Sequence, residues 1–267
     1  MIWDQILDWF NPMIEFLVQA AKIVEKYWPM LLRGAGMTLF VSILGTIFGT
    51  VIGFIIGTIR TIPLAERGFK RGILKIINAI LSAYVEFFRG TPMIVQASVI
   101  YYGSLMALGI DMDRTFAAVF IVSINTGAYM TEIIRGGIIS IDKGQFEAAH
   151  AIGMNHTKTM FHVILPQVMR NILPALGNEF VINIKDTSVL NVIAVTELFF
   201  QTKSIAGNTF KYFETYFVTC LMYLAMTLIV TRILRHVERK MDGPDSFNII
   251  PGNQMQVAKP EDLLKKK

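Results

Sequence analysis

Charged residues are scarce in this sequence of 267 residues. Only 17% of them are Asp, Glu, Lys or Arg, whereas 53% are hydrophobic, and the mean hydropathy is +0.50. A soluble domain carries roughly 25% charged residues, because its surface must be covered by polar groups. The scarcity of charge therefore excludes an ordinary soluble protein. The long charge-free runs predict several membrane spans instead.

The sequence also lacks the residue patterns typical of disulfide-bonded proteins, ATPases, metal-binding proteins and enzymes. A single cysteine, Cys220, excludes an intrachain disulfide. No G-x-x-x-x-G-K-[ST] phosphate loop is present, so any ATP hydrolysis is expected on another chain. His150, His156 and His162 recur every six residues, a spacing that does not place ligands on one helical face. No metal site, no cofactor of this chain and no catalytic set is predicted.

Five segments are predicted to cross the membrane as helices. They are residues 37–59, about 91–109, about 115–134, a segment within 174–200, and about 213–233. Thr91-Pro92 is expected to open the second span, since proline fits the first helical turn. Residues 72–89 are expected to form an amphipathic or interfacial helix, because three charges interrupt their apolar pattern. The predicted fold class is an all-α membrane protein with about five transmembrane helices.

The first predicted span contains a stripe of glycines. Gly45, Gly49, Gly53 and Gly57 recur every four residues and so share one face of the helix. Such faces let another helix approach closely. The stripe therefore predicts helix packing rather than ligand binding.

The distribution of basic residues predicts the orientation. The positive-inside rule assigns the loops richer in Lys and Arg to the cytoplasm. The richer set is Arg60, Arg67, Lys70, Arg71, Lys75, Arg89, Arg135, Lys143, Lys158, Arg170, Arg232, Arg235, Arg239 and Lys240; the poorer set is Lys22, Lys26, Arg33, Arg114, Lys203 and Lys211. The N-terminus is therefore expected outside and the C-terminus in the cytoplasm. The net charge of +5 is interpreted in this way rather than as a sign of nucleic-acid binding.

The cytoplasmic segment between spans three and four is predicted to form two helices joined at a glycine. Asp142 can cap the first helix, and Gly153 can end it in the left-handed conformation. Asn155 or Thr157 can cap a second short helix through Leu165, which Pro166 would perturb. The small side chains of the first helix suit docking against another protein. An ordinary amphipathic hairpin is the alternative that the spacing alone leaves open.

This segment resembles the cytoplasmic signature of the membrane-spanning permease subunits of binding-protein-dependent ABC importers. That signature reads EAA, three residues, Gly, nine residues, Ile, one residue, Leu-Pro. The matching residues are Glu147, Ala148, Ala149, Gly153, Val163, Leu165 and Pro166, with Val163 as a conservative departure from Ile. Leu31-Leu32-Arg33-Gly34 with Thr38-Leu39, YVEFFRGTP (84–92), EIIRGGI (132–138), LGNEF (176–180) and KDTS (185–188) resemble the branch that takes histidine, glutamine, glutamate and arginine. The resemblance covers roughly residues 30–235.

The resemblance implies a permease in a bacterial cytoplasmic membrane that works by alternating access. Its EAA loop would couple to a pair of ATPase subunits, which hold the ATP and Mg²⁺. A second permease chain, identical or homologous, and a separate extracytoplasmic amino-acid-binding protein are the other implied partners. The expected divisions are an interfacial segment (1–35), the permease domain (36–236, with the coupling loop at 136–171) and a cytoplasmic tail (237–267).

Several polar residues fall in or near the predicted spans. Lys185, Asp186, Thr187 and Ser188 would line the solute pathway, form a gate between permease chains, or lie solvated near the interface. Glu86 and Arg89, like Glu132 and Arg135, are expected at cytoplasmic ends of spans, where a departing zwitterionic solute would meet them. The alternative function is a passive channel or secondary carrier whose cytoplasmic hairpin is regulatory. ATP dependence separates the two functions.

Overall fold

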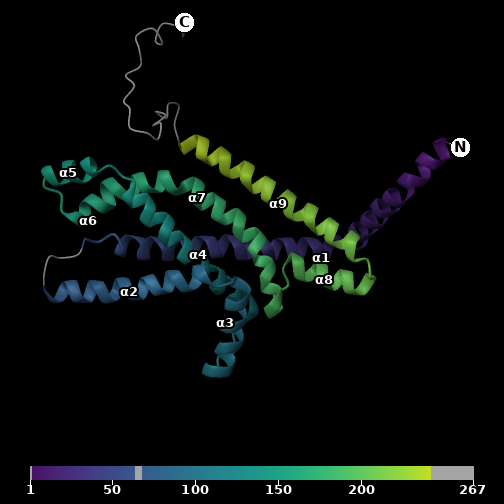
Figure 1. Ribbon diagram of the computed structural model, residues 1–267, viewed down its shortest axis with the longest axis horizontal. Coiled ribbons are helices and arrows are strands. Elements are labelled where there is room, and N and C mark those ends of the chain that lie inside the picture. The colour runs from purple at the N-terminus through teal and green to yellow at the C-terminus, as the bar shows by residue number, and fades with distance from the viewer. Residues whose placement is uncertain (1, 64–67, 242–267) are drawn as a thin grey trace, which may run out of the picture.

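The computed structural model describes the backbone of residues 2–63 and 68–241 and the side chains of 11–63 and 68–240. Every regular element in these ranges is helical, which confirms the all-α prediction. Most helices run along the long axis of an elongated molecule, with the start of the chain at one end and the α5–α6 region at the other (Figure 1). Three helices are long and apolar enough to cross a membrane, and the count rises to five if two bent helix pairs are each one span.

The first helix, α1 (Ile2–Ile59), runs through the boundary that was expected near residue 35. It has 58 residues and continues past Pro29. The physical reason is tertiary packing, because Ile23 and Leu31 are buried against Leu198 and Val218 of two later helices. The segment before residue 36 is therefore helical and continuous with the first predicted span.

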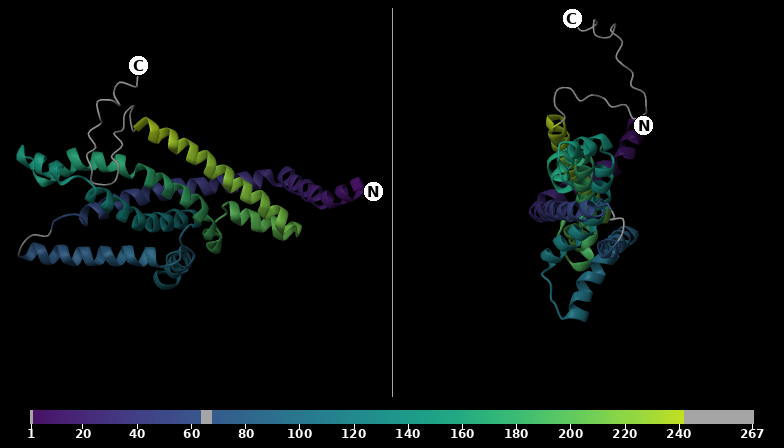
Figure 2. Two further views of the ribbon diagram at one scale, coloured as in Figure 1. Left: turned by 45° about the horizontal axis from the view of Figure 1, so that its top comes forward. Right: turned by 90° about the vertical axis from the view of Figure 1, so that its left-hand side faces the viewer.

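The second predicted span differs from the structure. The two helices α2 (Phe69–Gly90) and α3 (Met93–Leu108) meet at an angle of 113°. Only together are they long and apolar enough to cross a membrane. The amphipathic or interfacial helix expected over 72–89 is found as α2, which lies alongside α1 and α4 (Arg114–Ile139), while α3 turns away (Figures 1 and 2). The break falls at Thr91-Pro92 as expected, since the residue before a proline avoids the helical conformation.

The rest of the chain forms the end of the molecule opposite the N-terminus, and its later helices run back from that end (Figure 1). The elements are α5 (Lys143–Ala151), α6 (His156–Thr159), a π turn (Met160–Ile164), α7 (Leu165–Asp186), a 3₁₀ turn (Thr187–Ile193), α8 (Leu198–Thr209) and α9 (Tyr212–Met241). The fourth span was expected within 174–200. The continuous helical path instead starts at His156, runs to Ile193 and joins α8 at a bend of 56°. The fifth predicted span lies within α9, and the predicted tail beyond residue 241 lies outside the described residues.

The glycine stripe of α1 forms the contact with α4. A Cβ atom placed on Gly53 would lie 2.4 Å from Cβ of Met130 and 2.8 Å from its backbone carbon. One on Gly49 would lie 2.6 Å from Cβ of Thr126. Gly45 and Gly57 face Val122 and Ile134 in the same way. The two backbones approach so closely that only hydrogen fits between them.

A buried polar junction joins three helices in the interior. The Asn183 side chain of α7 donates to Oγ1 of Thr46 on α1 at 2.8 Å and to Oγ1 of Thr126 on α4 at 3.0 Å. All three residues are buried. Because a buried amide without partners is costly, this junction fixes where α7 lies against the α1–α4 pair.

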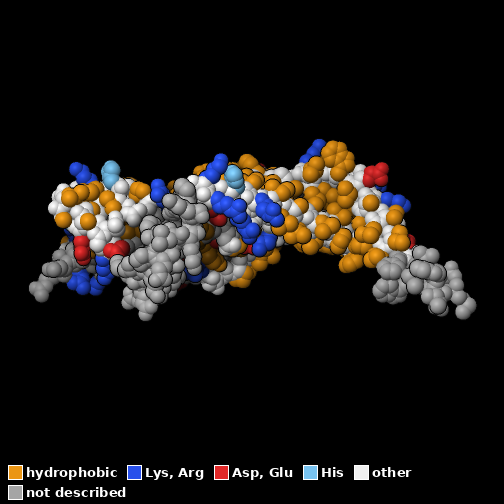
Figure 3. Space-filling model, turned by 90° about the horizontal axis from the view of Figure 1, so that it is seen from above, with side chains coloured by type: hydrophobic (Ala, Val, Ile, Leu, Met, Phe, Trp, Pro, Cys, Tyr) orange, Lys and Arg blue, Asp and Glu red, His pale blue; other side chains and the backbone are white. Residues whose placement is uncertain are grey.

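Hydrophobic side chains cover much of the outer surface. On the face shown in Figure 3 they dominate the end that holds the start of α1, whereas Lys and Arg side chains gather nearer the middle. The exposed set includes Phe40, Ile43, Ile47, Leu224 and Ile229. An apolar exterior of this extent is suited to lipid rather than to water.

Candidate functional site

The helix α5 is bounded by the two capping residues that the sequence predicted. The Asp142 side chain accepts a hydrogen bond from the backbone N–H of Gly144 at the start of the helix. At its end Gly153 has φ +81°. The Gly153 N–H donates to the His150 carbonyl at 2.9 Å, and the Met154 N–H donates to the Ala149 carbonyl at 3.0 Å. This is the Schellman arrangement, in which a glycine turns the chain sharply out of a helix.

The second helix of the loop starts as expected but does not stop at Pro166. The Asn155 side chain caps α6 by accepting from the Lys158 N–H at 2.9 Å. A π turn follows, and Pro166 lies in the first turn of α7. Proline cannot donate to the preceding turn and crowds the carbonyl four residues back. The wider π turn accommodates it, so one helical path leads from the loop into the membrane helix.

An apolar cluster holds the loop against the membrane helices. Ile134 and Ile138 of α4 are buried against Ile164 and Val168, and Phe146, Val163 and Leu165 pack on the same cluster. Ala149 is buried beneath α5. The loop is therefore packed firmly against α4 and the start of α7.

The opposite face of α5 is open. Glu147 and Ala148 are exposed, and Ile152, next to the glycine joint, has 78% of its surface exposed. Pro166 is exposed at the start of α7. The signature residues thus divide into an outer set (Glu147, Ala148, Gly153, Pro166) and an inner set (Ala149, Val163, Leu165).

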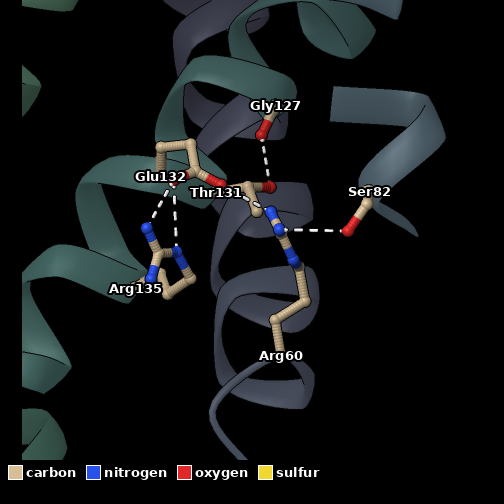
Figure 4. Close-up of polar contacts among 6 residues, drawn as sticks. All are labelled: Arg60, Ser82, Gly127, Thr131, Glu132 and Arg135. Atoms are coloured by element: carbon tan, nitrogen blue, oxygen red, sulfur yellow. Dashed lines mark hydrogen bonds and ion pairs between the residues drawn. The ribbon is translucent and has the colours of Figure 1, made fainter. Parts of the chain in front are cut away.

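A network of charges joins the end of α1 to α2 and α4 (Figure 4). One oxygen of the Glu132 carboxylate accepts from Arg60 at the end of α1. The other oxygen accepts from Arg135, one turn along α4, at 2.9 Å. Arg60 also donates to the Ser82 hydroxyl of α2 at 3.2 Å. Arg60 therefore links the Glu132 carboxylate of α4 to the Ser82 hydroxyl of α2.

We expect Glu132→Gln to destabilise the fold by about 1–3 kcal/mol. The Arg60 side chain is only 18% exposed, so removal of its carboxylate leaves a charge poorly solvated. Arg135→Gln is the matched control. It leaves the Arg60–Glu132 pair intact and removes a side chain that is 37% exposed, so we expect a loss below about 1 kcal/mol. Unfolding of both variants in mild detergent measures the difference, and equal losses would contradict this role of Arg60.

Glu86 and Arg89 lie at the bend between α2 and α3. They were expected at the cytoplasmic end of a span, and they occupy the last turns of α2, directly before the bend that leads into α3. Together with Arg60, Ser82 and Glu132 they line a pocket of about 450 Å³. The structure therefore brings these two candidates together with the charge network.

The four residues 185–188 are found elsewhere. Lys185 and Asp186 end α7 with exposed side chains. Thr187 is buried and its hydroxyl donates to the Ile184 carbonyl, and the Ser188 carbonyl accepts from Asn191. They mark the change from α-helix to 3₁₀ turn and do not line the pocket beside Glu86 and Arg89.

One acidic residue was not singled out from the sequence. Glu179 of α7 is only 7% exposed, and its carboxylate forms no hydrogen bond or ion pair with any residue that the structure describes. It lies four residues before Asn183 and seven before Asp186, so the three share a helical face. An acidic residue inside an apolar region was the available signal, since such residues usually face protein or a water-filled path.

Comparison with protein families gives one match that covers most of the membrane region. The family described as "Binding-protein-dependent transport system inner membrane component" matches residues 49–243. The chain belongs to this family. Its members' EAA signature is the motif found here on α5, and the expectation of a membrane-spanning permease subunit of an ABC importer, of the amino acid branch, is confirmed.

Individual relatives in this family match most of this chain. The glutamine transport system permease protein GlnP of Escherichia coli (strain K12) is 41% identical over 214 residues, covering 80% of this chain and 93% of the relative. The L-cystine transport system permease protein TcyB of Bacillus subtilis is 35% identical over 82% of this chain and 90% of its own. The arginine transport system permease protein ArtQ of Bacillus subtilis is 39% identical over 61% of this chain and 74% of its own.

Solved structures show the same fold for this family. A chain from the crystal structure of an amino acid ABC transporter with histidines is 38% identical, with a TM-score of 0.71, over 81% of this chain and 96% of its own. A chain of the MetNI methionine ABC transporter in an inward-facing conformation has a TM-score of 0.66 at 17% identity, over 81% and 98%. The second likeness concerns the fold alone.

Proposed function

We propose that this permease forms the translocation pathway of an ATP-driven importer for polar amino acids and switches its access by alternating between two conformations. The relatives named for glutamine, arginine and cystine transport support the substrate class. The chain lies in a bacterial cytoplasmic membrane, with its N-terminus outside and its C-terminus in the cytoplasm. Its partners are an ATPase pair that holds ATP and Mg²⁺, a second permease chain and a separate amino-acid-binding protein.

The observation that carries the coupling role is the construction of the EAA loop. Its outer face presents Glu147, Ala148 and the 78% exposed Ile152, while its inner face is fixed on Ile138 and Ile164. A partner that docks on the outer face therefore moves α4 and α7 as rigid bodies. Closure of the ATPase pair on ATP would favour one of the two permease conformations through this contact.

The solute path involves the polar groups of the membrane helices. Lys185 and Asp186 are exposed at the end of α7, and Thr187 and Ser188 follow where the helix narrows. This placement supports a path or a gate along that face of α7. Glu86 and Arg89 line the separate pocket at the α2–α3 bend.

The test is purification of the tagged chain from its native membrane in gentle detergent, followed by reconstitution into liposomes. We expect an ATPase subunit to copurify, and we expect uptake of L-glutamine, L-arginine or L-cystine only when ATP and the binding protein are both present. Uptake without ATP would instead favour a passive channel or a secondary carrier. Failure of any ATPase to copurify with intact protein would also contradict the proposal.

A further inference from the structure

The pocket at the α2–α3 bend is lined by one acidic and one basic side chain, Glu86 and Arg89, that lack charged partners among the described residues. Arg60 and Glu132 on one wall are paired with each other. On the other wall, neither Glu86 nor Arg89 forms an ion pair with any side chain that the structure describes. The Arg89 guanidinium lies over the ring of Tyr129, 5.6 Å from its centroid. One fixed charge of each sign therefore faces the same space.

Unpaired charges at this position require an explanation. A charged side chain in a membrane helix costs about 2.5–3.5 kcal/mol on insertion scales, and such residues usually face a partner or a watery path. Both side chains are exposed to the pocket side of α2 rather than buried among its apolar neighbours. The missing partner of each charge is therefore expected to be a ligand that enters the pocket.

The bend that carries these side chains is held rigidly. The Gln96 side chain of α3 donates to the carbonyls of Phe88 and Thr91, both at 2.9 Å, and closes the bend. Asn125 of α4 donates to the Gln96 carbonyl oxygen at 2.8 Å. The Tyr84 hydroxyl donates to the Ile124 carbonyl at 2.6 Å, which fixes α2 on α4. The backbone that carries Glu86 and Arg89 is thus set before any ligand binds, which lowers the entropy cost of binding.

We propose that this pocket binds the α-ammonium and α-carboxylate groups of the transported amino acid, with Arg89 on the carboxylate and Glu86 on the ammonium. The proposal rests on the proposed import function and assigns residues to its substrate. A guanidinium matches a carboxylate with two parallel hydrogen bonds. The pocket volume of about 450 Å³ lies within the roughly 300–1,000 Å³ typical of small-molecule sites.

The pairing of charges selects the zwitterion over other ligands. An anion such as a lipid phosphate would satisfy Arg89 but would bring a second negative charge to Glu86. A cation would do the reverse. An α-amino acid satisfies both side chains at once and leaves its own side chain free, so this site would accept different amino acids.

The test measures which groups of the ligand each residue recognises. Radiolabelled L-glutamine, L-arginine and L-cystine are bound to the full chain in lipid nanodiscs by equilibrium dialysis. Each label is competed with the free amino acid, its α-carboxamide and its Nα-acetyl derivative. For the wild type, we expect the free amino acid to compete at least about tenfold better than either derivative.

The variants give the decisive comparison. In Arg89→Gln we expect the advantage over the α-carboxamide to disappear, and in Glu86→Gln the advantage over the Nα-acetyl derivative. A loss of fold would lower all binding equally and would not change one preference alone. Lys75→Gln is the matched control, because Lys75 is an exposed charge on α2 outside the pocket. It should retain both preferences.

The outcomes separate this inference from the import function. Unchanged preferences in both variants overturn the inference, and so does a wild type without saturable binding of any of the three labels. Uptake driven by ATP and the binding protein is measured in parallel on the reconstituted wild-type complex. If uptake proceeds while the preferences do not depend on Glu86 and Arg89, the assignment of the pocket fails and the importer stands. If uptake is absent, the function itself fails.

Discussion

Replacement of Gly53 by leucine is expected to separate α1 from α4 and to lower stability by about 3 kcal/mol or more. The Cβ atom alone would lie 2.4 Å from Cβ of Met130 and 3.0 Å from the backbone nitrogen of Thr131. A contact with backbone cannot be relieved by a side-chain rotation, so the whole helix must shift. That shift would also break the Asn183 junction, which needs Thr46 and Thr126 within hydrogen-bond distance of one amide.

Gly36 provides a control on the same helix. A Cβ atom placed there meets nothing within 4 Å. Gly36→Ala should therefore raise stability by up to about 1 kcal/mol, because alanine favours a helix over glycine. Gly53→Ala should lower it despite the same gain in propensity. Unfolding in detergent of the alanine and leucine variants at both positions gives the sign and the size of each change in stability. Similar effects at the two positions would contradict the close α1–α4 contact.

The sequence indicated the glycine face but not the helix that it meets. A four-residue spacing shows that Gly45, Gly49, Gly53 and Gly57 share a face. It contains no information on the partner, which depends on how Val122, Thr126 and Met130 of α4 meet that face. The caps of α5 were predicted correctly because they are local. Asp142 and Gly153 act within a few residues of themselves, and the sequence shows those residues directly.

The errors in the fold arise from contacts between distant residues. The continuity of α1 past residue 35 depends on the packing of Ile23 and Leu31 against α8 and α9. The placement of α2 beside α4 depends on Tyr84 and on the Gln96–Asn125 hydrogen bond. Neither dependence can be read from hydropathy.

The same limit applies to the candidate site. Glu86 and Arg89 were named from their charge alone, whereas the pocket exists because Arg60 and Glu132 come from other helices to form its opposite wall. Glu179 lies in the LGNEF motif and in the region of the fourth predicted span, but that motif assigned no role to its carboxylate. Its burial depends on how α7 packs against the other helices, which hydropathy does not show.

Replacement of Gly153 by proline is expected to abolish coupling while the protein still inserts and folds. Proline fixes φ near −65°, whereas Gly153 has φ +81°, and proline lacks the N–H that donates to the His150 carbonyl. It would also force Ile152 out of its near-helical conformation. The end of α5 would then change direction, and the exposed face of Ala148 and Ile152 would no longer be presented to the ATPase partner that we propose.

The packing of the membrane helices should tolerate this change, because Gly153 lies outside the apolar cluster of Ile138, Ile164 and Val168. We therefore expect normal membrane yield and unfolding, loss of the copurifying ATPase, and a fall of more than about tenfold in ATP-driven uptake. Gly153→Asn is the matched control, since asparagine tolerates the left-handed conformation and keeps the N–H. It should retain most of the coupling. Normal uptake by the proline variant would show that the turn at Gly153 does not position the coupling surface, whereas a parallel loss in both variants would point to a requirement for glycine at the docking contact itself.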